Sequence, residues 1–168
     1  MLEVRPAVSA DLPALTIAFG ERHYFEDRLG RPPQQGVLFV AHLGAAVAGA
    51  AFLRMMQAEE WELRQHLRGV PILSHLQVAP NRRRQGVASA IMNAAEEHAR
   101  AKGRWRIALG VTPHNAAARR LYTNRGYVEW DFGEVNAMVV EYDETGRKRF
   151  STERCQILVK ALRAPVRV

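Results

Sequence analysis

The chain has 168 residues, 48% hydrophobic and 24% charged, which predicts one globular domain over residues 1–168 with a core of its own. A single cysteine excludes an internal disulfide and a cysteine-based zinc site, so we expect a cytoplasmic protein. No apolar run approaches the roughly 20 residues of a membrane span. The first residues also lack the apolar core of a signal peptide. Secreted disulfide-stabilised domains and membrane-spanning proteins are therefore not expected.

Positive charge is concentrated in the second half of the chain. The 24 cations and 17 anions give a net charge of +7. Residues 1–80 carry 7 cations and 8 anions (net −1), whereas residues 81–168 carry 17 cations and 9 anions (net +8). An excess of this kind points to an anionic partner, which could be a nucleic acid, a phosphorylated cofactor or an anionic surface.

Apolar runs and turn residues predict the elements in chain order. The first helix is expected to have Ser9 as its N-cap and Pro13 in its first turn. Two apolar runs around Gly44 predict a hairpin, and helical and strand patterns then alternate. The expected strands are 36–43, 47–53, 71–78, 106–111, 127–130, 136–142 and 156–162, and the later helices are 59–67, 86–102 and 115–125. This order is typical of an α+β or mixed α/β domain with one central sheet.

A basic turn at residues 81–85 connects a predicted strand to the longest predicted helix. Gly86, Ala88 and Ser89 open that helix with small side chains, which leave its first N–H groups accessible. The helix dipole and the arginines of the turn favour an anion there, most naturally a phosphate or diphosphate. The other interpretation is an ordinary helix start with solvated arginines. The segment has neither a P-loop Gly-Lys-Ser/Thr nor a Gly-x-Gly-x-x-Gly pattern.

Three motifs in this half resemble one known family. Arg83-Arg84-Gln85-Gly86-Val87-Ala88 fits the Gln/Arg-x-x-Gly-x-Gly/Ala signature of the GNAT N-acetyltransferase superfamily, and Leu76-Gln77-Val78 precedes it as that family's pantetheine-binding strand. Asn115-Ala116-Ala117-Ala118-Arg119-Arg120-Leu121-Tyr122, followed by Gly126-Tyr127, is similar to its Asn-x-x-Ala-x-x-Leu-Tyr-x-x-x-Gly-Phe/Tyr segment. The resemblance implies a mixed, mostly antiparallel central sheet, with helices on both faces and a splayed parallel strand pair.

The resemblance also implies acetyl-CoA as co-substrate. By position, Leu76, Gln77 and Val78 would hold the pantetheine arm, and Asn115 would bond near it. The diphosphate would meet Arg83, Arg84, Gln85, Gly86, Val87, Ala88 and Ser89. Arg82, Arg119 or Arg120 could reach the 3′-phosphate; for the last two, a solvated helix face is the alternative.

Tyr122 is the predicted catalytic acid. In the family's mechanism an amine attacks the thioester directly and a tyrosine protonates the leaving thiolate, which a phenol on a fixed helix can do. The alternative is that Tyr122 only packs, because Ala118 and Leu121 share its face. With the motif around it, we favour the catalytic role.

The general base is less clear, because the positions at which relatives place a carboxylate are Ile72 and Gly110 here. His75 and Ser74 are the nearby candidates, and His75 has a suitable intrinsic pKa. Alternation along a strand predicts that only one of these two faces the acceptor. A core role for His75, a water chain to Glu59, Glu60 or Glu62, and an amine that arrives neutral are the other possibilities.

The predicted function is acetyl transfer to a primary amine, on a small molecule or a peptide. An acidic, aromatic lip for a cationic amine is one interpretation of Glu26, Asp27, Glu59, Glu60, Trp61 and Glu62; a solvated surface is the other. The segment 131–153 is longer than a tight hairpin needs. Its basic tip at residues 147–149 could cap the site, contact a partner chain or be plain surface, and we favour plain surface. Family members are often dimers, so a homodimer is one option.

Two other classes compete with this prediction. One is a non-catalytic acyl-CoA-binding or regulatory module on the same fold, which the vacant base positions favour. The other is an RNA-binding protein, but the sequence has no recognisable RNA-binding motif and no aromatics interleaved with its arginines. A metal site is not predicted, because the six histidines form no metal-binding pattern.

Overall fold

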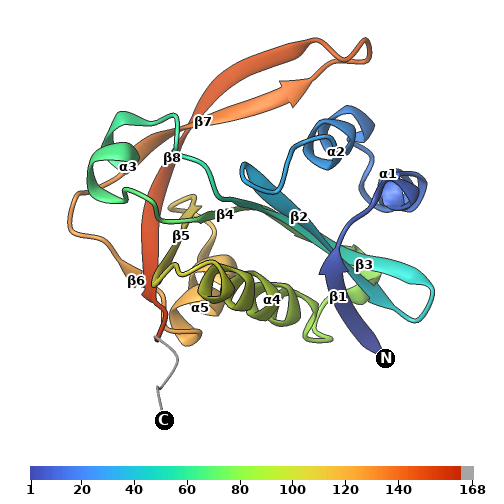
Figure 1. Ribbon diagram of the computed structural model, residues 1–168, viewed down its shortest axis with the longest axis horizontal. Coiled ribbons are helices and arrows are strands. Elements are labelled where there is room, and N and C mark those ends of the chain that lie inside the picture. The colour runs from blue at the N-terminus through green and yellow to red at the C-terminus, as the bar shows by residue number, and fades with distance from the viewer. Residues whose placement is uncertain (164–168) are drawn as a thin grey trace.

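The computed structural model describes residues 1–163 and shows one curved sheet flanked by helices (Figure 1). The strands are β1 (Leu2–Pro6), β2 (Gly36–Leu43), β3 (Ala46–Arg54), β4 (Ile72–Val78), β5 (Arg106–Val111), β6 (Val128–Glu129), β7 (Val135–Tyr142) and β8 (Lys148–Ala161). The helices are α1 (Leu12–Phe19), α2 (Arg22–Leu29), α3 (Trp61–His66), α4 (Val87–Ala101) and α5 (Ala116–Asn124), with short 3-10 turns η1 (Ser9–Asp11) and η2 (Pro80–Arg82) before α1 and α4. The predicted domain span also includes residues 164–168, which lie outside the described residues.

The sheet has the strand order β1-β2-β3-β4-β5-β8-β6, and β7 pairs with β8 alone. Every neighbouring pair is antiparallel except β4 and β5. Helices cover both faces. The predicted fold class, a mixed and mostly antiparallel sheet with one parallel strand pair, is confirmed.

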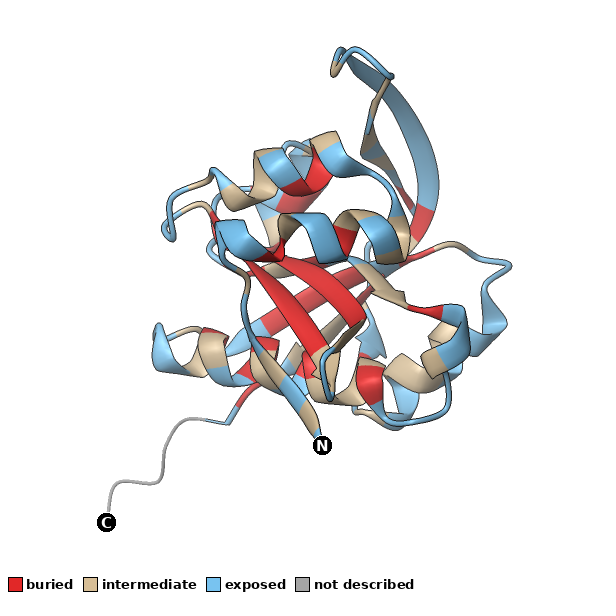
Figure 2. Ribbon diagram, turned by 90° about the vertical axis from the view of Figure 1, so that its right-hand side faces the viewer, coloured by how far each residue is buried: buried red, intermediate tan, exposed pale blue. Residues whose placement is uncertain are grey.

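The two faces of the sheet bury different helices (Figure 2). Ile91 and Met92 of α4 are fully buried on one face, with α5 at its margin. Leu15 of α1 and Phe25 of α2 are fully buried on the other face. A smaller cluster seats Leu63 of α3 beside β5 and β8 on the second face. Burial of this apolar surface, worth roughly 25 cal/mol per Å², fixes where each helix lies.

The first helix starts later than predicted, and the predicted N-cap at Ser9 is wrong. Ser9 lies in η1, and α1 begins at Leu12. The side chain that organises this turn is Asp11. Its carboxylate accepts a hydrogen bond from the Val8 N–H at 2.7 Å and forms an ion pair with Arg5 at 2.8 Å. A carboxylate with a charged partner holds the turn more strongly than a serine hydroxyl would.

The last strand begins at Lys148, eight residues before the predicted start at 156, and pairs with β7 from Tyr142 to Val135. The two strands form a long hairpin that leaves the main sheet and bends over α2 (Figure 1). At the tip, Lys148 lies 4.0 Å from Asp27. Tyr142 also accepts a hydrogen bond from Arg28 at 3.4 Å. Residues 147–149 are all exposed, and Lys148 adds a long surface ion pair to α2. Among the helices of residues 1–163, none is long and apolar enough to cross a membrane.

Candidate active site

The parallel pair β4–β5 opens after two residues. Ile72 pairs with Ala108 and Leu73 with Leu109, and no further pairing joins the two strands within the described chain. A β-bulge in β4 accompanies the opening: Ser74 pairs with Phe52 and Gln77 with Ala50, so two residues of β4 face one of β3. His75 is one of the extra pair and has a left-handed backbone, with φ at +57°. The bulge bends β4 away from β5 and leaves its far edge unpaired.

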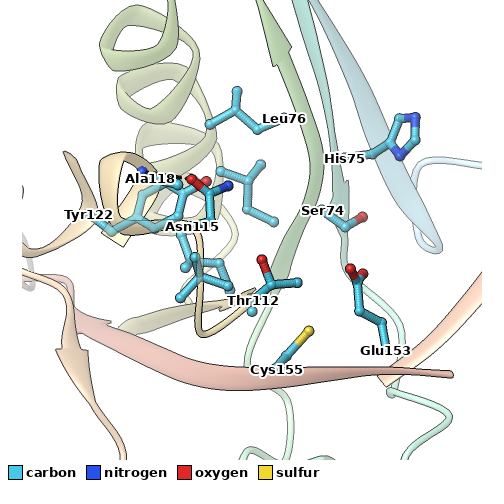
Figure 3. A pocket seen from close by; sticks show the side chains of 13 residues that line it. Ser74, His75, Leu76, Thr112, Asn115, Ala118, Tyr122, Glu153 and Cys155 are labelled. Atoms are coloured by element: carbon cyan, nitrogen blue, oxygen red, sulfur yellow. Dashed lines mark hydrogen bonds between the residues drawn. The ribbon is translucent and has the colours of Figure 1, made fainter. Parts of the chain in front are cut away.

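A cavity of about 330 Å³ fills the space between the two strands (Figure 3). It is lined by Leu73, Ser74, His75, Leu76, Leu109, Gly110, Val111, Thr112, Asn115, Ala118, Tyr122, Glu153 and Cys155. The structure thus brings together the predicted site residues Tyr122, Asn115, His75 and Leu76. The segments that contain them are far apart in the sequence.

Tyr122 reaches the cavity from α5. Its ring packs against the main core, and burial raises the pKa of its phenol. A raised pKa keeps the hydroxyl protonated at neutral pH, which is the state that a proton donor needs. Asn115 stands one helical turn away as the N-cap of α5, where its Oδ1 accepts a hydrogen bond from the Ala118 N–H at 3.2 Å. This bond leaves the two amide hydrogens of Asn115 free to donate.

His75 turns its ring away from Tyr122 (Figure 3). Its Nε2 lies 2.9 Å from Oε2 of Glu21, and its ring centroid lies 4.1 Å from that of Tyr24 of α2, with the two rings tilted by 34°. The hydrogen bond from His75 is the main cause that lowers the pKa of Glu21. Ser74 projects to the same side of β4. The expectation that only one of the two faces that side is wrong, because the bulge interrupts the alternation.

The predicted phosphate loop lies between β4 and α4. Arg84 and Gly86 both have left-handed backbones, with φ at +61° and +79°. A Cβ on Gly86 would meet no atom within 4 Å, so backbone conformation rather than space favours glycine here. Among the backbone N–H groups of residues 83–90 in the described chain, only that of Ala90 bonds a carbonyl outside α4, the Gly86 carbonyl at 3.0 Å. The preceding N–H groups are therefore available to an anion.

Side chains of the loop and the neighbouring helix differ in what they can offer that anion. Arg83, Arg84 and Gln85 are exposed, whereas the Val87 side chain is in the core, so Val87 can contribute only its N–H. Arg119 is bound to Glu129 at 3.2 Å and to Gln156. Arg119 is thus already paired, which makes it the weakest of the three candidates for a 3′-phosphate.

A family model, the acetyltransferase (GNAT) family, matches residues 6–127. The chain belongs to the GNAT family. The match spans most of the chain, from the end of β1 to the segment after α5, and includes β4, β5, the phosphate loop and Tyr122. Glu153 and Cys155 of the cavity lie outside it. The function that goes with membership is acetyl transfer from acetyl-CoA.

Solved GNAT structures share the fold of this GNAT chain. The ribosomal-protein-S18-alanine N-acetyltransferase of Escherichia coli is 18% identical with a TM-score of 0.68, and the alignment covers 99% of this chain and 96% of that one. Arabidopsis thaliana NAA60, solved with a bisubstrate analogue, is 17% identical with a TM-score of 0.71 and coverages of 97% and 100%. The PaiA N-acetyltransferase of Thermoplasma acidophilum, solved with coenzyme A, is 14% identical with a TM-score of 0.69 and coverages of 96% and 99%. A search of curated proteins finds no match.

The residues of this GNAT chain fit acetyl-CoA as co-substrate. Beyond Leu73, the β4 edge that faces β5 is unpaired, so its N–H and C=O groups can bond the amides of a pantetheine arm. The loop at residues 83–89 has free N–H groups for the diphosphate. The cavity at the β4–β5 opening, next to Tyr122, is where a thioester would lie.

Three cavity residues were missed by sequence reasoning: Thr112, Glu153 and Cys155. Cys155 is 7% exposed, and the pKa of its thiol is raised to about 11, first by burial and then by the negative charges of Glu153 and Glu60. A thiol with this pKa stays protonated at neutral pH and is a poor nucleophile. Glu153 could not be identified because its segment gave no strand pattern, and only the register of β8 places it in the cavity.

Proposed function

We propose that this GNAT protein transfers the acetyl group of acetyl-CoA to a primary amine by direct attack in a ternary complex. The observation that carries the proposal is the cavity at the β4–β5 opening, which brings an unpaired strand edge and a protonated Tyr122 to the same place. The strand edge, at Leu76 and Val78, holds the pantetheine arm with help from Asn115. The N–H groups of the phosphate loop bind the diphosphate.

Tyr122 supplies the proton that the leaving sulfur needs. As the C–N bond forms and the C–S bond breaks, negative charge develops on the thiolate, and its protonation by the phenol makes it a better leaving group. An acyl-enzyme on Cys155 is disfavoured by the raised pKa of that thiol. The amine therefore attacks the thioester without a covalent intermediate.

The acceptor approaches from the face of the sheet that carries α2 and α3. Three of the six lip residues are already neutralised in part: Glu26 pairs with Arg22, Asp27 with Arg28 and Arg31, and Glu59 with Arg54. Glu60, Glu62 and the 64% exposed Trp61 are left to contact a cationic amine. A small amine or a peptide amino group would fit this description.

Tyr122→Phe tests the function. We expect the variant to bind acetyl-CoA as the wild type does and to lower kcat by about 10²–10⁴-fold, the effect of losing a positioned acid. Thiol release with a panel of primary amines measures turnover, and calorimetry measures acetyl-CoA binding.

Tyr142→Phe is the matched control, because Tyr142 lies on the hairpin and contacts Arg28 at 3.4 Å outside the cavity lining. If Tyr122→Phe turns over as fast as the wild type, the tyrosine has no part in the reaction. If the wild type binds acetyl-CoA but acetylates no amine of the panel, the non-catalytic module becomes the better description.

A further inference from the structure

Glu153 is the only carboxylate among the residues that line the cavity in the described chain. Successive side chains of a strand alternate between its faces, so Glu153 shares a face with Cys155 and Ile157 on β8. Ile157 pairs with Gly110 on β5. A Cβ on Gly110 would lie 3.3 Å from the Cβ of Cys155. Gly110, Cys155 and Glu153 therefore form one continuous surface on the α3 side of the sheet.

This surface places Glu153 across the cavity from Tyr122. Tyr122 comes from α5, on the opposite face of the sheet, whereas the Glu153 carboxylate points from β8 toward Ser74 on β4 (Figure 3). An acid on one side and a carboxylate on the other leave the opening between β4 and β5 for the reacting atoms. This is the arrangement that a proton donor and a proton acceptor need.

The carboxylate of Glu153 is not committed to another partner. Within residues 1–163, no cation lies within ion-pair distance of it, although its neighbour Arg154 is paired with Glu134. The titratable groups that line the cavity with Glu153 are Cys155 on its own strand, His75 on β4 and Tyr122 on α5. Glu60, before α3, is close enough to raise the pKa of the same Cys155 thiol as Glu153 does. His75 is hydrogen-bonded to Glu21 and faces away from Tyr122.

We propose that Glu153 takes a proton from the acceptor ammonium and so acts as the general base that the vacant positions Ile72 and Gly110 do not supply. This inference rests on the proposed function. It also identifies the acceptor as an amine that arrives as a cation, attracted by Glu153 and Glu60. The proposed base lies on β8, the strand that pairs with β5, where Gly110 is found.

The proton balance of the reaction is complete with these two residues. Glu153 takes one proton from R–NH₃⁺ and releases it to solvent. The neutral amine forms the C–N bond to the acetyl carbon as the C–S bond breaks, and Tyr122 gives its proton to the sulfur. The second proton lost by the nitrogen restores the Tyr122 phenol, so the products are the acetamide, the free thiol of CoA and one proton.

Glu153→Gln tests the inference, because it removes the base and keeps the size of the side chain. With the best alkylamine of the panel, we expect kcat/KM at pH 7 to fall by about 10²–10⁴-fold. The deficit should shrink as the pH approaches the pKa of the amine, since solvent then supplies the neutral form. Acetyl-CoA affinity and thermal stability should stay at the wild-type level. Glu141→Gln, an exposed change on the same face of the hairpin, is the control and should behave like the wild type.

A variant with wild-type kcat/KM, or with a deficit that is the same at every pH, would overturn the role of Glu153 while the wild-type activity still supports acetyl transfer. A wild type that binds acetyl-CoA but acetylates no amine would instead overturn the proposed function on which the inference rests.

Discussion

Glu96 is a carboxylate that stays charged in the core. It is 3% exposed, and it accepts hydrogen bonds from Lys160 at 2.7 Å, Arg125 at 3.2 Å and the Tyr127 hydroxyl at 3.0 Å. Burial alone would raise the pKa of Glu96, but the two cations together lower it below its ordinary value. These contacts tie α4, the end of α5 and β8 together behind Tyr122. We expect them to hold the helix that carries the proposed acid.

Glu96→Gln should therefore destabilise the fold. Removing one partner of a buried ion pair leaves uncompensated charge and costs about 3–5 kcal/mol. Because the folded pKa of Glu96 is lowered, its contribution is present above the unfolded pKa of 4.5 and is lost as the pH falls through the folded value. Urea unfolding at pH 7 and at pH 4 measures both effects, and the difference between wild type and variant should narrow at the lower pH.

Glu97→Gln is the matched control one residue along α4. Glu97 pairs with Arg100 at 3.0 Å, but its side chain is 77% exposed. Exposed pairs of this kind contribute at most about 1 kcal/mol. An equal loss of stability in both variants would show that the cluster around Glu96 has no special role.

The orientation of the His75 ring is set by Glu21 and Tyr24, which are distant from it in the sequence. His75→Asn removes the imidazole, and asparagine tolerates a left-handed backbone better than most residues. We expect this variant to keep most of the wild-type kcat/KM, because the ring faces Glu21 and Tyr24 rather than the cavity centre. The measurement is kcat/KM against pH with the best alkylamine of the panel. A loss as large as that of Glu153→Gln, and with the same pH dependence, would make His75 the base, as the sequence suggested.

At the scale of elements, α4 is flanked by two glycines with left-handed backbones, Gly86 directly before it and Gly103 shortly after it. Gly86 has φ at +79° and Gly103 has φ at +74°, and at both positions an added Cβ would meet no atom within 4 Å. The alanine variants should thus lose similar stability, about 1–2 kcal/mol each, from backbone conformation alone. Comparing the two alanine variants therefore separates the effect of glycine on backbone conformation from its effect on acetyl-CoA binding.

We expect Gly86→Ala, and not Gly103→Ala, to weaken acetyl-CoA binding. Only Gly86 lies in the loop whose N–H groups face the diphosphate in the proposed function. Calorimetry with acetyl-CoA gives the affinities, and thermal melting gives the stabilities. Equal acetyl-CoA affinity in the two variants would contradict the placement of the diphosphate at this loop.

The elements that sequence patterns predicted best are those with several buried apolar residues. The strand 106–111 is found as predicted, and α4 and α5 differ from their predicted ranges by one residue at each end. The start of β8 was missed because residues 148–154 are exposed, so their sequence carries no apolar alternation. The bulge at His75 was missed because it is stabilised by Glu21 and Tyr24, far away in the sequence. Neither a pattern nor a motif predicted that Glu153 lies in the cavity. Its position depends on the early start of β8 and on the bulge in β4, and both of these were missed.

At the scale of the whole molecule, the positive second half is partly neutralised by its own anions. Arg125 and Lys160 pair with Glu96, and Arg154 pairs with Glu134. In contrast, the consecutive arginines 82–84 have no carboxylate partner within residues 1–163. The nearest carboxylates lie beyond 4.0 Å, which is the length of the ion pair between Lys148 and Asp27. Three adjacent cations without a carboxylate partner therefore lie in the loop that the proposed function assigns to the CoA phosphates.

This distribution predicts how CoA binding depends on salt. Changing Arg82, Arg83 and Arg84 to glutamine should weaken CoA binding by about tenfold, equivalent to ~1.4 kcal/mol, and should make the remaining affinity less sensitive to salt. The control is the double change Arg147→Gln and Arg149→Gln, which removes exposed charge from the hairpin tip and should alter neither property. Calorimetry at low and high salt, with CoA and separately with a single-stranded RNA, provides the comparison. Tight RNA binding with a steep salt dependence, and no affinity for CoA, would contradict the assignment of these arginines to the CoA phosphates. A nucleic acid would then be the favoured anion, because the salt dependence of RNA binding reports the number of phosphates that the protein neutralises.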